Sequence, residues 1–216
     1  MHRKAVEFDP ENAPAHTNLG IALSHNKDVA GAIAQHQKAI ELNPRYAIAY
    51  NNLGIALKDK GDFDGAIAAY RKALELDPND APAYSNLGIV YRAKRNLDGA
   101  IAAYRKALEI DPSYAKAHYN LGLALNDAKD LDGAIAAYRK AIDCDPKLSQ
   151  PYNNLGNTLR EKKDLHGALA ALQKTIALEP TEATAHNNLG HVLRDMGDLD
   201  GALAVTSQWV QSLSCA

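Results

Sequence analysis

The stretch of sequence that decides the fold is residues 85–114, "SNLGIVYRAKRNLDGAIAAYRKALEIDPSY". Residues 51–80, "NNLGIALKDKGDFDGAIAAYRKALELDPND", are almost a copy of it and lie 34 positions earlier. Self-similarity at a fixed period of this length is typical of stacked structural units, each too small to bury its own apolar face. The sequence therefore predicts an array of small units in place of one globular core.

The glycines and prolines follow the same period along the whole chain. The 14 glycines include two series of six with a spacing of 34 residues, and six of the nine prolines have the same spacing. A unit that starts at Ala13 puts each series at one fixed position. This choice predicts a partial repeat at 1–12, followed by six units at 13–46, 47–80, 81–114, 115–148, 149–182 and 183–216.

Each unit has the pattern of two helices joined by a short turn. In the third unit, Tyr84, Leu87 and Tyr91 are three or four positions apart, which puts them on one face of a first helix. Asn96, which is Asp in the other units, can cap a second helix because its side chain accepts hydrogen bonds from free N–H groups. That helix ends before Pro112, since proline cannot continue a helix. The unit is therefore predicted to be a helical hairpin.

This pattern resembles the tetratricopeptide repeat family. The family motif is a large residue, Leu-Gly, Tyr or Leu, Ala, an aromatic residue, Ala and Pro. The third unit supplies Tyr84, Leu87, Gly88, Tyr91, Ala100, Tyr104, Ala107 and Pro112. The resemblance covers essentially the whole chain. It implies an all-α fold, a right-handed superhelical solenoid of antiparallel helix pairs, with first helices on the concave side and second helices on the convex side.

The sequence departs from the family pattern in each second helix and at both ends. Glycine stands where the family often has Glu, which predicts a weaker helix start by about 1 kcal/mol relative to Ala. Residues 1–12 match part of a second helix, which indicates that the chain begins in mid-repeat. The sixth unit loses the pattern after about residue 204, where Trp209 takes the position of the small Ala107.

Three interpretations of this last segment stay open: a vector-derived or frayed tail, a natural terminator, and a sticky end that pairs with another chain. Arrays need polar capping helices for solubility, and the sequence shows none. Trp209 and Val210 are therefore predicted to take part in end-to-end self-association.

Asparagine occupies the sixth position of every unit. At 100° per residue, this position points away from the predicted core stripe of the first helix. Asparagine is a poor helix former, so six of them inside helices require an explanation. An amide both donates and accepts hydrogen bonds, so a row of amides can hold the backbone of an extended peptide. The six residues are Asn18, Asn52, Asn86, Asn120, Asn154 and Asn188.

Two other interpretations of these asparagines stay open, namely hydrogen bonds between neighbouring helices of the stack and simple surface polarity. The row is similar to that of the repeat arm of O-linked N-acetylglucosamine transferases, whose asparagines hold substrate chains. With no catalytic domain in these 216 residues, that resemblance implies recruitment only.

Apolar and basic side chains flank the row of asparagines. Ile55, Ile89 and Leu123 would supply apolar contact. The twelfth position of four units is basic and could bind acidic side chains or a C-terminal carboxylate, or could simply be solvated surface. The carboxylate clamp of chaperone-tail-binding family members is not reproduced, because the fifth positions lack lysine. The basic residues are Lys58, Arg92, Arg160 and Arg194.

Several classes of function are excluded by the residues present. The chain has no phosphate-binding loop, dinucleotide fingerprint, nucleophile elbow or metalloprotease motif, so no enzyme activity, cofactor or metal is predicted. A net charge of −2 argues against nucleic-acid binding. The lack of a long apolar run or a signal peptide predicts no membrane span and a cytoplasmic location. Cys144, at a position of Leu or Ile in other units, is predicted to be buried.

Two classes of function remain. The first is a non-enzymatic protein–protein interaction scaffold that holds an extended peptide or partner segment in its concave groove. The alternative is an assembly module that forms homo-oligomers through uncapped array ends.

Overall fold

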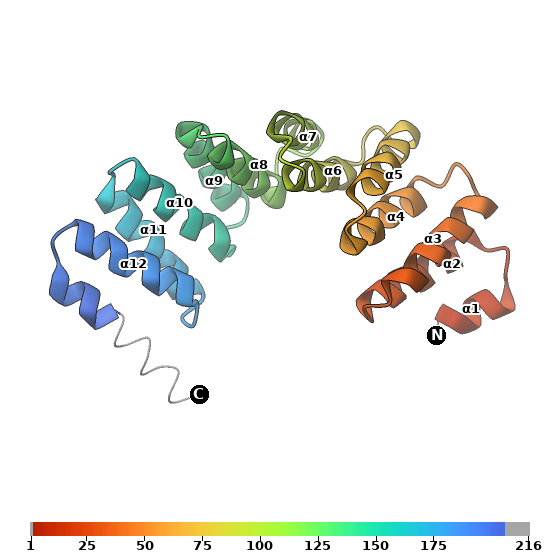
Figure 1. Cartoon of the computed structure of the whole chain (residues 1–216), viewed down its shortest axis with the longest axis horizontal. Coiled ribbons are helices and arrows are strands. Elements are labelled where there is room, and N and C mark those ends of the chain that lie inside the picture. The colour runs from red at the N-terminus through yellow and green to blue at the C-terminus, as the bar shows by residue number, and fades with distance from the viewer. Residues whose placement is uncertain (1, 206–216) are drawn as a thin grey trace. The chain divides into compact units, whose positions relative to one another are not determined.

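The computed structural model describes residues 2–205, and every regular element in that range is a helix. Consecutive helices pair in antiparallel fashion (Figure 1). This confirms the predicted all-α array of helix pairs. Trp209 and Val210 lie outside the described residues.

The chain divides into two compact parts, Met1–Pro112 and Ser113–Ala216, called here the N-terminal part and the C-terminal part. The N-terminal part contains α1 (His2–Phe8), α2 (Ala13–His25), α3 (Val29–Leu42), α4 (Ala47–Lys60), α5 (Phe63–Leu76), α6 (Ala81–Ala93) and α7 (Leu97–Ile110). The C-terminal part contains α8 (Ala115–Asp127), α9 (Leu131–Cys144), α10 (Ser149–Glu161), α11 (Leu165–Leu178), α12 (Ala183–Asp195) and a helical segment at 199–205.

The second helix of each pair begins at the polar residue predicted to cap it. The side chain of Asn96 accepts a hydrogen bond from the N–H of Gly99 at 3.0 Å. An added Cβ at Gly99 would lie 2.8 Å from the Asn96 side chain, so the cap occupies the space beside the glycine. The same arrangement is present at the five aspartates that stand in this position, Asp28, Asp62, Asp130, Asp164 and Asp198.

A left-handed residue joins the two helices of each pair. Gly61 and Gly197, the two glycines outside the periodic series, have φ values of 88° and 85°. Glycine adopts this conformation without steric cost because it has no Cβ. Basic residues adopt it at the equivalent position of the other four pairs, with φ between 61° and 66°: Lys27, Arg95, Lys129 and Lys163.

The helices of a pair pack through a glycine of the first helix. An added Cβ at Gly88 would lie 2.6 Å from the ring of Tyr104, and one at Gly20 would lie 2.5 Å from the ring of His36. Both distances are shorter than carbon atoms can approach without displacement. The surface that each glycine meets is a buried ring of the second helix.

One prediction about the core is wrong. Cys144 is exposed, whereas the residues at the equivalent position of other units, such as Leu76 and Ile110, are half-buried. The position lies in the last turn of the second helix at the margin of the core. The short thiol side chain covers less of that margin than Leu or Ile does.

No helix in the described part of the chain combines the length and the hydrophobicity needed to cross a lipid bilayer. Among residues 2–205, no three His, Cys, Asp or Glu side chains come together as a metal site would require.

Candidate functional site

The first helices form a continuous layer within each part. α2 contacts α4 and α4 contacts α6, while α10 contacts α12 and is joined to α8 by a hydrogen bond between Asn154 and Tyr119. Among the described residues, the second helices pack on first helices and make no comparable contact with one another. The first helices are therefore on the inner, concave side of each part.

Three of the six asparagines bond to the preceding unit. In each case the side-chain Nδ2 of the sixth residue donates to the side chain of the fifth residue of the unit before. Asn86 donates to Asn51 Oδ1 at 3.2 Å, Asn154 to the Tyr119 hydroxyl at 2.9 Å, and Asn188 to Asn153 Oδ1 at 3.0 Å. At these positions the asparagines do bond neighbouring helices, which was one of the three interpretations of the row.

These bonds leave the acceptor side of each amide available. The Oδ1 atoms of Asn86, Asn154 and Asn188 accept no hydrogen bond from another residue in the range 2–205. All three side chains are half-buried, so they are held by the stack and still reach the surface. An amide in this state can bond a neighbouring helix and a ligand at the same time.

The row is not uniform. Asn52 donates to the Ile48 carbonyl of its own helix at 2.9 Å. The hydroxyl of Thr17, the fifth residue of the preceding unit, is buried and has no partner among the described residues. Asn18 is exposed, and Asn120 is half-buried.

The apolar residues predicted beside the row are accessible to different degrees. Ile89 is 36% exposed, while Ile55 and Leu123 are half-buried. Ile48 on α4 is 53% exposed, which makes it the more accessible apolar side chain of the N-terminal part's first-helix layer. The layer thus offers apolar contact as well as amides.

Neighbouring side chains engage three of the four predicted basic residues. Arg160 Nε donates to Asp195 Oδ2 at 2.6 Å, and this hydrogen bond holds the pKa of Asp195 below its ordinary value. Lys58 Nζ lies 3.1 Å from Asp59 Oδ1, and Nη2 of Arg194 lies 3.1 Å from Nδ1 of His191. Arg92 lies on α6. The two carboxylates reduce the positive charge that the layer offers to an acidic ligand.

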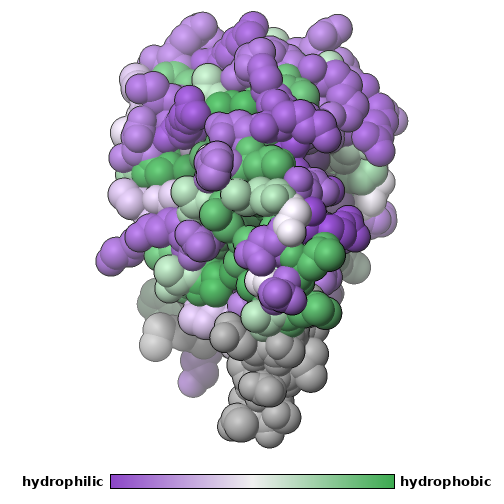
Figure 2. All heavy atoms as spheres, turned by 90° about the vertical axis from the view of Figure 1, so that its left-hand side faces the viewer, coloured by the Kyte–Doolittle hydropathy of each residue, from purple (hydrophilic) through white to green (hydrophobic). Residues whose placement is uncertain are grey.

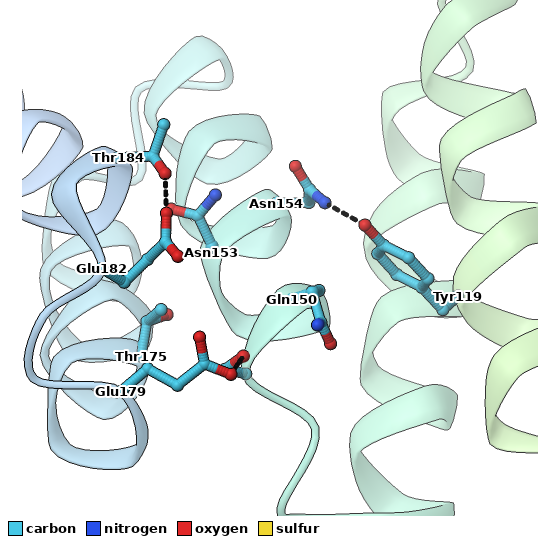
Figure 3. Close-up of a pocket in the computed structure, with 9 residues that line it drawn as sticks. Tyr119, Gln150, Asn153, Asn154, Thr175, Glu179, Glu182 and Thr184 are labelled. Carbon is cyan, nitrogen blue, oxygen red and sulfur yellow. Dashed lines mark hydrogen bonds between the residues drawn. The ribbon is translucent and has the colours of Figure 1, made fainter. Parts of the chain in front are cut away.

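A pocket of about 200 Å³ opens among the helices of the C-terminal part (Figure 3). Tyr119 and Asn154 lie on one side of it, and Glu179, Glu182 and Thr184 lie on the other. The remaining lining residues are Ser149, Gln150, Asn153 and Thr175.

Ser149, Thr175, Glu179 and Glu182 were not predicted as site residues. A signal for the first three was present in the sequence, because the first four units have Ala, Ala and Asp or Asn at their positions. Such a signal is a difference between units, which a family motif does not contain.

The comparisons with known proteins agree with the repeat pattern. Tetratricopeptide repeat profiles match residues 11–79, 51–115, 85–149 and 137–170, and a TPR repeat profile matches 156–197. The chain belongs to the tetratricopeptide repeat family. No curated protein matches this TPR chain at a significant level.

Solved structures similar to this TPR chain include MamA, which is 30% identical with a TM-score of 0.70, over 76% of this chain and 90% of that one. YrrB, a TPR protein with an unusual peptide-binding site, is 26% identical with a TM-score of 0.66, over 85% and 95%. PilF of Pseudomonas aeruginosa has a TM-score of 0.82 over 94% and 93%, but at 18% identity it shows the fold alone.

Proposed function

We propose that this TPR chain is a non-enzymatic protein–protein interaction scaffold that holds an extended peptide segment of a partner along its first-helix layer. The observation that carries the proposal is that Asn86, Asn154 and Asn188 donate through Nδ2 to the neighbouring unit and have Oδ1 atoms that are left to accept. Peptide N–H groups supply the matching donors at regular intervals. The similarity to YrrB, a TPR protein with a peptide-binding site, supports this function.

Binding through these amides would tolerate many peptide sequences. A bond from a peptide N–H to an asparagine Oδ1 does not depend on the peptide side chain. Ile48 and Ile89 add apolar contacts that favour some side chains over others. Sequence preference would then come from the positions beside the amides.

Two matched double variants separate ligand binding from helix stacking. Asn86→Ala with Asn154→Ala removes both interhelix bonds and both free acceptors. Asn51→Ala with Tyr119→Phe removes the same two bonds but keeps the acceptors. For peptides selected from a random display library on the unaltered chain, we expect the first variant to bind about tenfold more weakly or worse, since two hydrogen bonds are lost.

The second variant should bind within about threefold of the unaltered chain, because only stacking bonds worth about 1 kcal/mol each are removed. Dissociation constants measured by calorimetry test both expectations. Equal loss of affinity in the two variants would show that the asparagines act through stacking alone. If the library yields no binders at all, the scaffold proposal itself fails.

A second candidate function is self-association through the ends of the array. Phe8 on α1 is 92% exposed, and Leu199 and Leu203 of the segment 199–205 are 61% and 68% exposed. The two leucines line a hollow with Gly190 and Ala202. Figure 2 shows hydrophobic residues gathered on this side of the C-terminal part. Accessible apolar area of this kind favours association.

If the ends associate, the average mass in sedimentation equilibrium should rise with protein concentration. Leu199→Gln with Leu203→Gln should then abolish the rise, because polar side chains remove the apolar area that association buries. Ile48→Gln is the control and should leave the rise unchanged, because Ile48 is an exposed apolar residue on the first-helix layer and not at an array end. A mass that stays monomeric at all concentrations rules this function out.

A further inference from the structure

Three residues of the fifth unit that depart from the first four units come together in the structure. Each replaces a residue type that the first four units share at the same position. Ser149 stands where they have Ala13, Ala47, Ala81 and Ala115; Thr175 stands where they have Ala39, Ala73, Ala107 and Ala141; and Glu179 stands where they have Asn43, Asp77, Asp111 and Asp145. All three line the pocket of Figure 3, although they are up to 30 residues apart in the chain.

The change from Asp to Glu moves a carboxylate out of its own loop. Asp77 and Asp145 use Oδ1 to accept the N–H group two residues later, at 3.1 Å in both cases. The Glu179 side chain is one methylene longer and instead accepts a hydrogen bond from the Ser149 hydroxyl on α10. Ser149 is only 3% exposed, so this donor fixes the Glu179 carboxylate at the pocket.

A second carboxylate lies at the same pocket. Glu182 precedes α12 but makes no capping hydrogen bond to that helix. Its side chain instead accepts a hydrogen bond from the hydroxyl of Thr184, which also lines the pocket (Figure 3). Both carboxylates therefore have hydroxyl donors and, among residues 2–205, no Lys or Arg within ion-pair distance.

Other acids on the first-helix layer of this part are already paired with bases. Asp195 is bound by Arg160 at 2.6 Å, and Glu161 lies 3.6 Å from Lys129. At the pocket, by contrast, Glu179 and Glu182 carry negative charge with no Lys or Arg of residues 2–205 in ion-pair contact. The positive N-terminal ends of α10 and α12 offset only part of it, since each helix end carries roughly half a unit charge.

The opposite wall of the pocket contains Asn154, one of the asparagines of the row. Asn154 and its partner Tyr119 line it together with Gln150, so the pocket opens directly beside the proposed path of a bound peptide. Its volume of about 200 Å³ is below the roughly 300–1,000 Å³ of small-molecule sites. That size suits one long side chain.

We infer that this pocket receives a basic side chain, Lys or Arg, of the peptide held along the first-helix layer. The inference rests on the proposed scaffold function and adds a sequence preference to it. The ammonium or guanidinium group would bond to the Glu179 and Glu182 carboxylates, in charge-assisted hydrogen bonds that are about twice as strong as neutral ones. The peptide backbone beside it would bond to Asn154.

The test is a selection of random displayed peptides on the full chain and on a variant with Glu179→Gln and Glu182→Gln. The variant Glu75→Gln with Glu109→Gln is the matched control, because it makes the same change in net charge at two exposed second-helix residues that do not line the pocket. Thermal unfolding of all three proteins checks that each is folded. Selected peptides are then remade with their basic residue changed to norleucine and, in separate peptides, with Lys and Arg exchanged.

The inference predicts that the unaltered chain and the control select peptides with a basic residue at one fixed position. The pocket variant should still select peptides but without that preference, and should bind a basic peptide about ten- to a hundredfold more weakly. Norleucine in the peptide should weaken binding to the unaltered chain by a similar factor and have little effect on the pocket variant, as a direct contact requires.

Two other outcomes would overturn the inference and are distinct from each other. Peptides selected without a fixed basic residue, or with one that the pocket variant retains, would reject the pocket while leaving the scaffold function in place. A chain that selects no peptides would reject both. The exchange of Lys and Arg then shows which of the two cations the pocket prefers.

Discussion

Lowering the pH from about 7 to about 5 should reduce the free energy of unfolding by about 2 kcal/mol through His36 alone. His36 is 1% exposed on α3, its Nδ1 has no partner among the described residues, and its ring packs against Gly20. Burial lowers its pKa from 6.5 to about 4. Between these values the unfolded chain binds a proton that the folded chain does not, so acid favours unfolding.

The depressed pKa of His36 sets the direction of this effect on the free energy of unfolding and the pH range in which it occurs. The stabilisation is fully present above about pH 6.5 and is lost as the pH falls toward about 4. Urea denaturation followed by circular dichroism at several pH values measures the slope. His36→Tyr is the control, because tyrosine occupies this position as Tyr70, Tyr104 and Tyr138 in three other units and does not titrate in this range. A slope that persists unchanged in this variant would assign the effect to other groups.

Tyr70→Ala should reduce the free energy of unfolding by about 3–5 kcal/mol, because it leaves a cavity in the core of the N-terminal part. Tyr70 is fully buried and packs in a cluster with Ala66, Leu74, Leu87 and Val90. The same denaturation experiment at neutral pH measures the loss. A loss below about 1 kcal/mol would mean that the neighbouring helices close over the cavity.

Tyr70→Phe is the matched variant and should not destabilise the protein. The Tyr70 hydroxyl is buried and has no hydrogen-bond partner among the described residues. Burial, with a smaller contribution from the charge of Asp59, raises its pKa, so it stays neutral. A buried hydroxyl without a partner costs about 1–3 kcal/mol, so removing it should leave stability unchanged or raise it by up to about 1 kcal/mol. A clear loss of stability would show that the hydroxyl is hydrogen-bonded.

The sequence predicted the helix pairs well because each pair is specified over short distances. The cap at Asn96, the proline at Pro112 and the glycine at Gly88 all act within one unit. The same residue pattern recurs in several units, so one irregular unit does not hide it. The prediction that Cys144 is buried was wrong, because burial at the edge of the core depends on how far one side chain reaches.

The candidate site was only partly predictable. The repeat period predicted an asparagine at one position of every first helix. It did not predict which residue accepts the hydrogen bond from the asparagine Nδ2. Asn154 meets Tyr119, and Asn52 instead bonds to Ile48 of its own helix. Such choices depend on side-chain rotamers and on the residue that the preceding unit offers, which no pattern within one unit contains.

The linear sequence was enough to establish the repeat period, the helix ends and the repeat family, because those properties depend on residues a few positions apart. Tertiary structure decided which distant side chains meet. Ser149 and Glu179 are 30 residues apart, and only the stacking of α10 and α11 brings a hydroxyl to a carboxylate and leaves Glu182 beside them. The pairing of Arg160 with Asp195 likewise exists only once α10 and α12 are side by side.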